Sequence, residues 1–239
     1  MKVAFVVPAY RAERTLAPVV AGLLEGAKSL TAAGETPVIV VDDGSNDATA
    51  DVARQAGAEL LRHESNRGKG AALLTGFRHA AQQGARAVVT VDADGQHPPE
   101  QAIELARHPA PADALVLGVR DLRAAGAPGK NQFSNAFSNA WMSFFAGRPL
   151  ADTQCGLRRY PLRETLELGL HSSGYELESE VILKAARAGL TLVETNVRVI
   201  YPPANERVTH FHNVRDPARI VFRILHTAFT TRAHRRATP

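Results

Sequence analysis

Cysteine is almost absent from this 239-residue chain, in which Cys155 is the only example. A single cysteine excludes an internal disulfide framework and indicates a reducing compartment. No stretch approaches the roughly 18 apolar residues of a membrane-spanning helix. The apolar start at 3–7 is broken by Pro8, too early for a secretory signal. We therefore expect a cytoplasmic protein that is either soluble or peripheral at the inner face of the cytoplasmic membrane.

Neither composition nor charge indicates disorder or nucleic-acid binding. Hydrophobic residues make up 45% of the chain and charged residues 22%, which is typical of globular proteins. The net charge is +4, but apart from a small cluster at 232–236 the basic residues are scattered among acids. Because no arginine–aromatic patch accompanies this charge, we expect no nucleic-acid partner. The oligomeric state is left open.

Short apolar runs alternate with helical patterns over the first 120 residues. This alternation predicts an α/β fold with a mostly parallel central sheet and helices on both faces. Runs typical of strands lie at 3–7, 38–41, 58–61, 86–91, 114–117 and 191–200. Helical patterns lie at 15–33, 46–55, 70–83, 133–145 and 175–188, and others begin near 98 and 216. No repeat or interdomain linker interrupts the chain, so we expect one domain over 1–239.

Acidic residues gather where the expected strands end. In open α/β sheets, ligands bind beyond the carboxyl ends of the strands. The clusters are Asp42-Asp43, Asp92-x-Asp94 and, after an aromatic helix, Asp152. For any one cluster the alternative is ordinary turn chemistry, which also favours Asp and Gly. Three clusters on the same edge would favour a functional site.

Asp92 and Asp94 form the most informative cluster. Two carboxylates spaced i, i+2 at a strand end can both reach one hard divalent cation if the chain turns, and Gly95 permits a turn. Mg²⁺ or Mn²⁺ prefers oxygen ligands and leaves positions open for phosphate oxygens. Gln96 and His97 are further candidate ligands, directly or through water. A bare Asp-x-Asp is common by chance, so the motif needs support from the other clusters.

A glycine-rich segment precedes the helical pattern at 70–83. Asn66-Arg67-Gly68-Lys69-Gly70 lacks the leading glycine and the Ser or Thr that define a P-loop. It can still present backbone N–H groups and Lys69 at a helix N-terminus, where anions bind. The alternative is a glycine-rich helix start without a ligand.

The helix expected from Tyr175 turns one acid toward its apolar side. At 100° per residue, Glu178 falls inside the arc that contains Leu177, whereas Glu176 and Glu180 fall on the opposite face. A carboxylate on a core-facing arc is unfavourable unless it is paired or used in chemistry. Such an environment suits a general base. The alternative is a structural glutamate that accepts hydrogen bonds.

An aromatic stripe stands out in a chain with only 6% aromatic residues. Its members recur at helical spacing and are Phe133, Phe137, Ala140, Trp141, Phe144 and Phe145. This stripe, and the helical pattern that begins near 216, are candidates for contact with a membrane surface, with the basic tail facing anionic headgroups. Core packing is the alternative for both.

The motifs, taken in this order, resemble family 2 glycosyltransferases. The matching pieces are Val6-Val7-Pro8-Ala9-Tyr10, Val41-Asp42-Asp43-Gly44-Ser45, Asn66-x-Gly68-Lys69-Gly70, Asp92-Ala93-Asp94-Gly95-Gln96-His97-Pro98-Pro99 and Asp152-Thr153-Gln154-Cys155-Gly156-Leu157-Arg158. The last two look most like the polyprenyl-phosphate (dolichyl-phosphate) mannose and glucose synthase branch. The resemblance covers about residues 2–200, and its specificity lies in the combined order.

The resemblance implies an enzyme with the GT-A fold. It implies a nucleotide-sugar-binding half at 1–120, an acceptor-side half at 121–215, and an amphipathic helix with a basic tail at 216–239. The implied reaction is an inverting, metal-dependent transfer of a hexose from a UDP- or GDP-sugar to a lipid acceptor such as polyprenyl phosphate.

The same resemblance implies roles for residues by their position in the motifs. The implied donor-binding residues are Pro8, Ala9, Tyr10, Asp42, Asp43, Lys69, Asp92, Arg120 and Arg207. The implied ligands of Mg²⁺ or Mn²⁺ are Asp92, Asp94 and Gln96. The implied sugar and acceptor side contains Gln154 and Arg158, and the implied catalytic residues are Glu178, Asp94 and Asp152.

Three departures from the family pattern leave the acceptor open. Pro-Ala-Tyr continues as Arg11-Ala12-Glu13, where the family often has Asn-Glu-Glu. The Gly and Ser that commonly follow the arginine at 207 are missing, as are the carboxy-terminal transmembrane helices of some members. The alternatives are a lipid or carrier-bound hydroxyl acceptor, and a nucleotide-sugar-binding protein or nucleotidyltransferase with the same metal site.

Overall fold

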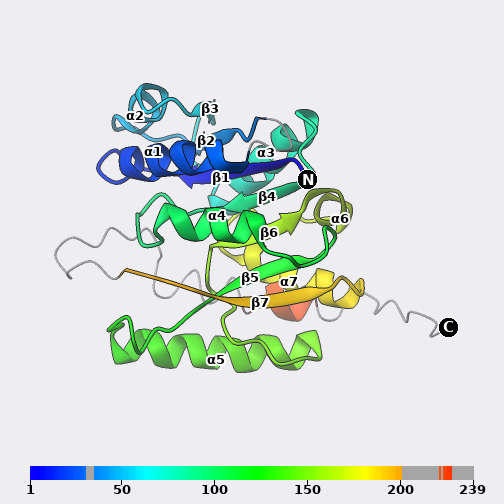
Figure 1. Cartoon of the computed structure of the whole chain (residues 1–239). Coiled ribbons are helices and arrows are strands. Elements are labelled where there is room, and N and C mark those ends of the chain that lie inside the picture. Colours follow the sequence, from blue (N-terminus) through cyan, green and yellow to red (C-terminus); the bar gives the residue numbers. More distant parts are fainter. Residues whose placement is uncertain (31–34, 201–220, 222, 228–239) are drawn as a thin grey trace.

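A seven-stranded sheet with helices on both faces forms the centre of the molecule (Figure 1). The computed structural model describes residues 1–30, 35–200, 221 and 223–227. Its strands are β1 (Val3–Ala9), β2 (Val38–Asp42), β3 (Glu59–Arg62), β4 (Ala87–Thr90), β5 (Leu115–Arg120), β6 (Arg158–Pro161) and β7 (Leu192–Val197). Their order across the sheet is β3-β2-β1-β4-β6-β5-β7.

Only β6 among these strands runs against its neighbours. It pairs antiparallel with β4 and β5, whereas β1 with β2, β1 with β4, β2 with β3 and β5 with β7 are all parallel. The prediction of a mostly parallel sheet is therefore confirmed. Strands from both predicted halves of the chain belong to this one sheet.

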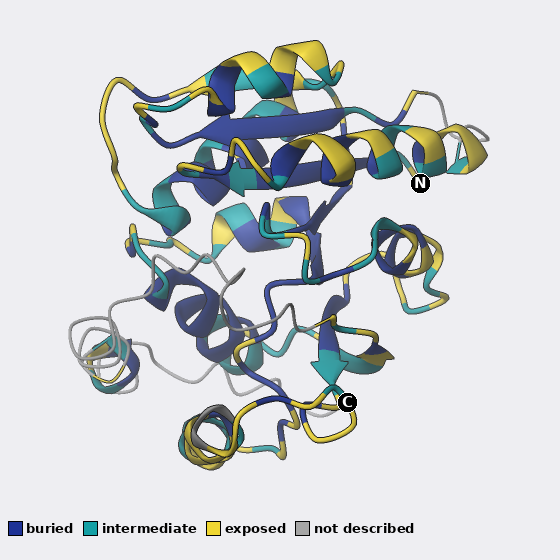
Figure 2. Ribbon diagram, turned by 90° about the vertical axis from the view of Figure 1, so that its left-hand side faces the viewer, coloured by how far each residue is buried: buried dark blue, intermediate teal, exposed yellow. Residues whose placement is uncertain are grey.

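Helices cover the two faces of the sheet because each buried strand is apolar on both sides. Alternate residues of a strand point to opposite faces. In β1, Phe5 and Val7 join the core beneath α1 and α4, while Ala4 and Val6 join the core beneath α3 and α7. Figure 2 shows the central strands coloured as buried. The helices are α1 (Leu16–Ala27), α2 (Thr49–Gln55), α3 (Lys69–Gln82), α4 (Pro99–Arg107), α5 (Gly129–Ala146), α6 (Leu162–Glu167) and α7 (Glu176–Arg187), with a 3₁₀ turn, η1, at Lys28–Leu30.

The sequence pattern did not predict β6 or the short α6. Arg158 and Arg159 begin β6 and are both fully buried. Arg158 donates to the carbonyls of Cys155, Thr153 and Glu178, and Arg159 donates to carbonyls in the segment at 108–111. Two arginines beside a proline have no strand-like pattern, and the carbonyls that make their burial tolerable come from other parts of the chain.

Several element ends differ from the sequence expectation. The helix expected over 15–33 ends at Ala27 and continues as the 3₁₀ turn, and residues 31–34 lie outside the described part. The helix α5 begins at Gly129, earlier than expected, and β7 ends at Val197 rather than at 200. Most of the helix and tail expected at 216–239 lies outside the described residues. In the part of the chain that is described, no helix is long and apolar enough to cross a membrane.

Candidate active site

The predicted site residues that follow β1, β2 and β4 lie at one edge of the sheet, because these three strands are parallel neighbours. Pro8, Ala9 and Tyr10 follow the course of β1 to this edge, and the amide of Asp43 donates to the carbonyl of Ala9 (2.8 Å). The Asp92–Asp94 turn comes directly after β4. The structure therefore brings the β1, β2 and β4 motifs together where open α/β sheets bind ligands.

Lys69 links Asp92 to Glu178. Its ammonium Nζ lies 2.7 Å from Asp92 Oδ1 and 3.3 Å from both carboxylate oxygens of Glu178. Burial alone would lower the pKa of Lys69, but the charges of Asp92 and Glu178 outweigh it and raise the pKa above its ordinary value. Lys69 is therefore a fixed cation between two carboxylates that come from β4 and α7.

Backbone contacts hold Lys69 at the first position of α3. Gly68 has a φ of 99°, a conformation that favours glycine, and a Cβ at Gly70 would overlap the carbonyl of Gly174. The amide of Ala71 donates to the carbonyl of Ser173 (2.9 Å). Close packing of this helix start against the turn before α7 brings the amine to Glu178.

Asp92 and Asp94 concentrate negative charge at the end of β4. Burial would raise the pKa of Asp92, but Lys69 holds it below its ordinary value. Burial and the neighbouring Asp92 charge together raise the pKa of Asp94 to about 6. A divalent cation would relieve this accumulation of carboxylates.

The residues at this turn fit a divalent cation by their chemistry. Asp92 and Asp94 supply oxygen donors two residues apart, and Gly95 turns the chain with a φ of 72°. A Cβ at Gly156 would overlap the Asp92 carboxylate, so this carboxylate can occupy its position only because residue 156 has no side chain. Within the described ranges, no three His, Cys, Asp or Glu side chains are grouped so that they could hold a metal ion. The protein would thus supply few ligands and leave the others to substrate oxygens, as is common for Mg²⁺.

Asp43 organises the loop that leads to Lys69. Its carboxylate accepts the backbone N–H groups of Arg67 (2.9 Å) and Gly68 (2.7 Å), and its Oδ1 lies 2.6 Å from His63 Nδ1. The site contribution of Asp43 in this structure is therefore to fix the loop. A direct contact with a donor remains a prediction.

Asp42 braces the adjoining turn. The side chain is completely buried, its Oδ1 accepts the N–H of Ser45 (3.0 Å), and Arg62 Nε lies 3.1 Å from its Oδ2. Gly44 has a φ of 71°, and a Cβ there would collide with the backbone of Ser65. Because no part of the Asp42 side chain is exposed, the predicted contact of Asp42 with a donor is corrected to a structural role.

Tyr10 carries a feature that sequence reasoning missed. The guanidinium of Arg11 lies 5.2 Å from the centroid of the Tyr10 ring, and Arg11 has a φ of 50°, the one positive value for a non-glycine in the described part of the chain. The amide of Arg11 donates to Ser45 Oγ (2.9 Å). A strained backbone beside a site points to a functional constraint, and the only signal in the sequence was that Arg11 departs from the usual family residue.

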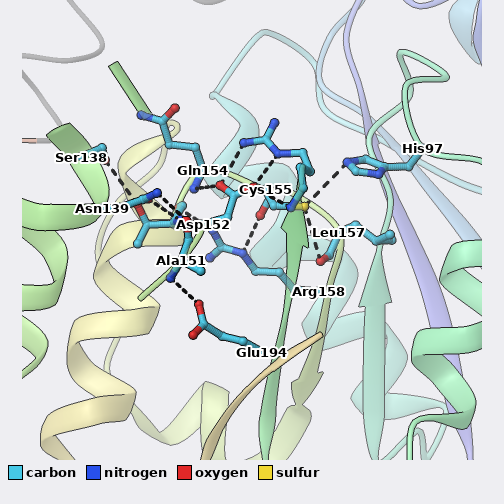
Figure 3. Close-up of polar contacts among 12 residues, drawn as sticks. His97, Ser138, Asn139, Ala151, Asp152, Gln154, Cys155, Leu157, Arg158 and Glu194 are labelled. Carbon is cyan, nitrogen blue, oxygen red and sulfur yellow. Dashed lines mark hydrogen bonds and ion pairs between the residues drawn. The ribbon is translucent and has the colours of Figure 1, made fainter. Parts of the chain in front are cut away.

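Arg120 and Asp152 hold each other at the end of β5. Arg120 Nε donates to Asp152 Oδ2 (2.7 Å) and Nη2 donates to Oδ1 (3.0 Å). The amide of Gln154 donates to the same carboxylate (3.1 Å; Figure 3). The Gln154 side chain is exposed. Because both oxygens of the buried Asp152 are engaged, the geometry supports positioning of Arg120 and Gln154 rather than the predicted catalytic role of Asp152.

Comparison with known proteins assigns this arrangement to a family. The model of the family described as "Glycosyl transferase family 2" matches residues 4–159, about two thirds of the chain. The chain belongs to glycosyl transferase family 2. It is therefore an enzyme, a glycosyltransferase, as the motif order predicts.

Several proteins with similar sequences to this glycosyltransferase are named for polyprenyl-phosphate or polyprenol acceptors. The undecaprenyl-phosphate mannosyltransferase of Micrococcus luteus is 30% identical over 84% of this chain and 84% of its own length. The polyprenol monophosphomannose synthase of Mycolicibacterium smegmatis is 27% identical over 80% of this chain and 75% of its own length. These relatives support the resemblance to the polyprenyl-phosphate sugar transferase branch.

Solved structures confirm the GT-A-like fold of the glycosyltransferase. The glucosyl-3-phosphoglycerate synthase of Mycobacterium tuberculosis, in complex with Mn²⁺, UDP and phosphoglyceric acid, superimposes with a TM-score of 0.67 at 20% identity, over 95% of this chain and 78% of that one. The mannosyl-3-phosphoglycerate synthase of Rubrobacter xylanophilus gives a TM-score of 0.64 at 18% identity, over 95% and 73%. At these identities the likeness concerns the fold.

Arg158 is enclosed in the interior of the glycosyltransferase, next to the loop of Asp152 and Gln154. Its guanidinium is fully buried and donates to three backbone carbonyls, those of Thr153 (2.8 Å), Glu178 (2.8 Å) and Cys155 (2.7 Å). Figure 3 shows Arg158 beside Cys155. The predicted role of Arg158 beside an acceptor is corrected accordingly. The residue joins the Asp152 loop to α7, so it supports the site from within.

His97 faces the interior and not the turn that would hold a metal. Its Nδ1 lies 3.0 Å from the carbonyl of Arg198 and so carries the proton, and its Nε2 lies 3.7 Å from Cys155 Sγ. Burial raises the pKa of the Cys155 thiol to about 12, as for a packed small residue. His97 as a metal ligand is therefore corrected, while Gln96 remains a predicted ligand.

The helix wheel of α7 was only partly right. Glu178 is buried as predicted, but Glu176 and Glu180, expected on the opposite face, are buried too. Glu180 accepts the N–H groups of His171 and Ser172. The turn before α7 covers the face that the wheel assigned to solvent. Arg207, the remaining predicted donor-binding residue, lies outside the described part of the chain.

Proposed function

We propose that this glycosyltransferase moves a hexose from a UDP- or GDP-sugar to polyprenyl phosphate at the cytoplasmic face of a membrane, with inversion and with Mg²⁺ or Mn²⁺ as cofactor. One observation carries the proposal. Asp92 and Asp94 stand at the carboxyl end of β4, and the Lys69 cation contacts Asp92 at 2.7 Å. Carboxylates for a metal ion and a fixed cation for phosphate are the groups that a sugar diphosphate requires.

The donor half of the proposal draws on the charges of this edge. Asp92 and Asp94, with Gln96, would hold the divalent ion. When bound, that ion would supply Lewis-acid stabilisation of the charge on the departing nucleoside diphosphate. Lys69 would add a positive charge next to the diphosphate. Pro8, Ala9, Tyr10 and Asp43 border the same edge and would enclose the nucleoside.

The acceptor half draws on the pairing of Glu178. Both oxygens of its carboxylate lie 3.3 Å from Lys69 Nζ. The carboxylate is therefore paired with a cation and is not available as a free base. A lipid phosphate is already anionic and needs no base. Its oxygen would attack the anomeric carbon while the bond from that carbon to the diphosphate oxygen breaks, and this displacement inverts the configuration. Arg120, held by Asp152, would position the phosphate of the donor or the acceptor.

The names of the relatives support the same acceptor class. They include a "UDP-N-acetylglucosamine--dolichyl-phosphate N-acetylglucosaminyltransferase" from Methanococcus voltae, 27% identical over 82% of this chain. We carry this acceptor chemistry to the present chain as a proposal.

A hydroxyl acceptor is the second candidate, because Glu178 is a buried acid at the site. Replacement of Glu178 by Gln separates the two. With a phosphate acceptor we expect Glu178→Gln to retain transfer within about tenfold, since no proton must be removed, whereas a hydroxyl acceptor would lose about 10²- to 10⁴-fold. The measurement is the rate of transfer from UDP- or GDP-sugars to polyprenyl phosphate and to a polyprenol.

The released nucleotide tests the reaction class in the same assay. Transfer of a sugar releases UDP or GDP. The amount released equals the amount of lipid-linked sugar phosphate that is formed. Release of pyrophosphate from a nucleoside triphosphate, with no sugar lipid formed, would replace the proposal by a nucleotidyltransferase.

A further inference from the structure

One face of α5 is apolar and exposed along the length of the helix. The side chains of Phe133, Phe137 and Phe144 are 76%, 60% and 78% exposed. Ala136 and Ala140, which lie between them at helical spacing, are exposed as well. We call these five residues the α5 face. A contiguous exposed apolar patch of this kind marks an interaction surface more often than a chance arrangement.

Packed rings support the exposed ones. Phe137 stacks on Trp141, with centroids 6.5 Å apart and planes at 12°. Phe144 meets Phe145 edge to face at 5.1 Å, and Phe145 meets Trp141 in the same manner at 5.1 Å. Trp141 and Phe145 in turn pack against the core beneath α7. Core packing therefore explains Trp141 and Phe145. Phe137 and Phe144 of the α5 face pack on these two rings from outside.

The chain segment that contains α5 carries basic residues and no acids, between Asp121 and Asp152 at its two ends. From 122 to 151 the sequence contains three basic residues, Arg123, Lys130 and Arg148, and no acidic residue. Arg123 is exposed, and a basic segment that carries an apolar helical face is complementary to the anionic headgroups of a membrane.

The other side of α5 is hydrogen-bonded to the loop at 151–154, which contains Asp152 and Gln154 and which we call the acceptor-side loop. Asn139 Oδ1 accepts the backbone N–H of Thr153 (2.8 Å) and its hydroxyl (2.9 Å), and Asn139 Nδ2 donates to the carbonyl of Ala151. Ser138 Oγ lies 3.3 Å from Thr153 Oγ1. The same helix therefore presents an apolar face outward and holds the loop of Asp152 and Gln154 on its other side.

We propose that the α5 face docks the glycosyltransferase onto an anionic lipid bilayer, with the aromatic rings at the boundary between headgroups and acyl chains. The proposal rests on the lipid acceptor of the proposed function, because docking through α5 brings the acceptor-side loop to the membrane that contains the acceptor. The helix lies at the surface and does not span, since Ser, Asn and Gln occupy much of its remaining circumference.

Two charge-insertion variants test the docking surface. Ala136→Glu with Ala140→Glu places two acids on the α5 face and removes no ring. Ala17→Glu with Ala21→Glu is the matched control, because these alanines are also exposed and four residues apart, on α1. The two helices lie at opposite ends of the molecule (Figure 1), and in Figure 2 α5 is seen nearly end-on at the bottom, largely coloured as exposed.

Flotation with vesicles of phosphatidylglycerol and phosphatidylcholine measures binding. We expect the wild-type protein and the α1 control to float with the vesicles, and the α5 variant to bind about tenfold or more weakly. Transfer to a long-chain polyprenyl phosphate in the vesicles should fall in parallel. Transfer to a short-chain, water-soluble polyprenyl phosphate should stay unchanged.

Three results would overturn docking through α5. The first is a wild-type protein that does not bind the vesicles, and the second is equal binding by the α5 variant and the α1 control. The third is a wild-type dimer in sedimentation velocity that the α5 variant dissociates, which would assign the α5 face to a second copy. Vesicle binding without transfer to either acceptor would instead contradict the proposed function, while the comparison of the α5 variant with the α1 control would still test docking.

Discussion

Lys69 sets the charge balance of the site at the scale of single residues. It stands between Asp92 and Glu178, and the three groups come from α3, the end of β4 and α7. The pairing keeps Asp92 ionised and gives Glu178 a partner in a buried place. Lys69 therefore lies beside the carboxylate that would hold a divalent ion, where its charge would also act on a bound phosphate.

Gly156 provides a test of how closely Asp92 is positioned. An alanine there would overlap the Asp92 carboxylate and force it to move. We expect Gly156→Ala to lower the rate of sugar transfer by about 10- to 100-fold, because small displacements of site groups have effects of this size. The melting temperature should change by only a few degrees.

Gly129→Ala is the matched control for that substitution. A Cβ at Gly129 meets nothing within 4 Å, and this glycine has no positive φ. Both variants are assayed with the water-soluble acceptor. Equal rates for Gly156→Ala and Gly129→Ala would show that the position of the Asp92 carboxylate does not matter for transfer.

The sequence allowed us to predict a site residue where its role depends on residues adjacent to it in the chain. Asp92 and Asp94 stand two residues apart after a strand, so their juxtaposition follows from the strand itself. The pairing of Lys69 with Asp92 and Glu178 could not be predicted, because it depends on how α3 meets α7. The buried contacts of Arg158 and His97 could not be predicted for the same reason. Arg158 bonds to the carbonyl of Glu178 in α7, and His97 contacts a carbonyl and a thiol from distant segments.

At the scale of elements, α7 is held by buried acids as well as by apolar contacts. Glu180 is 1% exposed, accepts the amide of Ser172 (2.8 Å) and pairs with Lys184 (2.7 Å). Burial raises the pKa of Glu180, but Lys184 and the Ser172 hydrogen bonds outweigh it and lower the pKa below its ordinary value. A carboxylate with a lowered pKa in the folded state stabilises the fold above its unfolded-state pKa. That contribution is lost as the pH falls through the folded-state pKa.

Replacement of Glu180 by Gln tests this contribution. We expect Glu180→Gln to reduce the free energy of unfolding at neutral pH by about 2 kcal/mol, since it weakens several buried hydrogen bonds to a charged group. As the pH falls below the ordinary range of a glutamate pKa and the wild-type carboxylate becomes protonated, the difference should shrink. The measurement is urea unfolding across pH.

Glu167→Gln is the control for Glu180. Glu167 pairs with Arg163 on the surface, and both side chains are largely exposed. Its replacement should change the free energy of unfolding by less than about 0.5 kcal/mol. A loss for Glu180→Gln no greater than that of Glu167→Gln, or one that does not depend on pH, would contradict the role given to Glu180.

Elements with strong local patterns were predictable, and those that depend on the rest of the fold were not. Apolar runs marked β1, β2 and β4. The strand β6 was missed because its arginines become acceptable in the interior only when distant carbonyls accept their hydrogen bonds. The helical period of α7 was correct, but which side of it faces solvent depends on the turn at 171–174.

At the scale of the whole molecule, the donor edge and the α5 face are far apart along the sheet order. The donor motifs follow β1, β2 and β4, whereas α5 follows β5, near the other end of the sheet. The loop of Asp152 and Gln154 joins the two regions through Asn139. This arrangement would let a soluble nucleotide sugar enter on one side while a lipid approaches from the other.

Ligand binding should stabilise the whole molecule in a metal-dependent way. We expect a UDP- or GDP-sugar together with Mn²⁺, at about one hundred times the dissociation constant, to raise the melting temperature by about 5–10 °C. Either ligand alone should raise it less, because Asp92 and Asp94 supply few ligands and would leave the other positions of the ion to diphosphate oxygens. Equal stabilisation by the sugar nucleotide with and without Mn²⁺ would mean that the ion does not take part in donor binding.

The most direct test of the central claim is the rate of sugar transfer by Asp94→Ala. We predict a loss of about a hundredfold or more, with no recovery at high Mn²⁺ or Mg²⁺, and a far-ultraviolet circular dichroism spectrum equal to that of the wild-type protein. Transfer at the wild-type rate, with the wild-type response to added metal, would contradict a divalent ion held by Asp92 and Asp94.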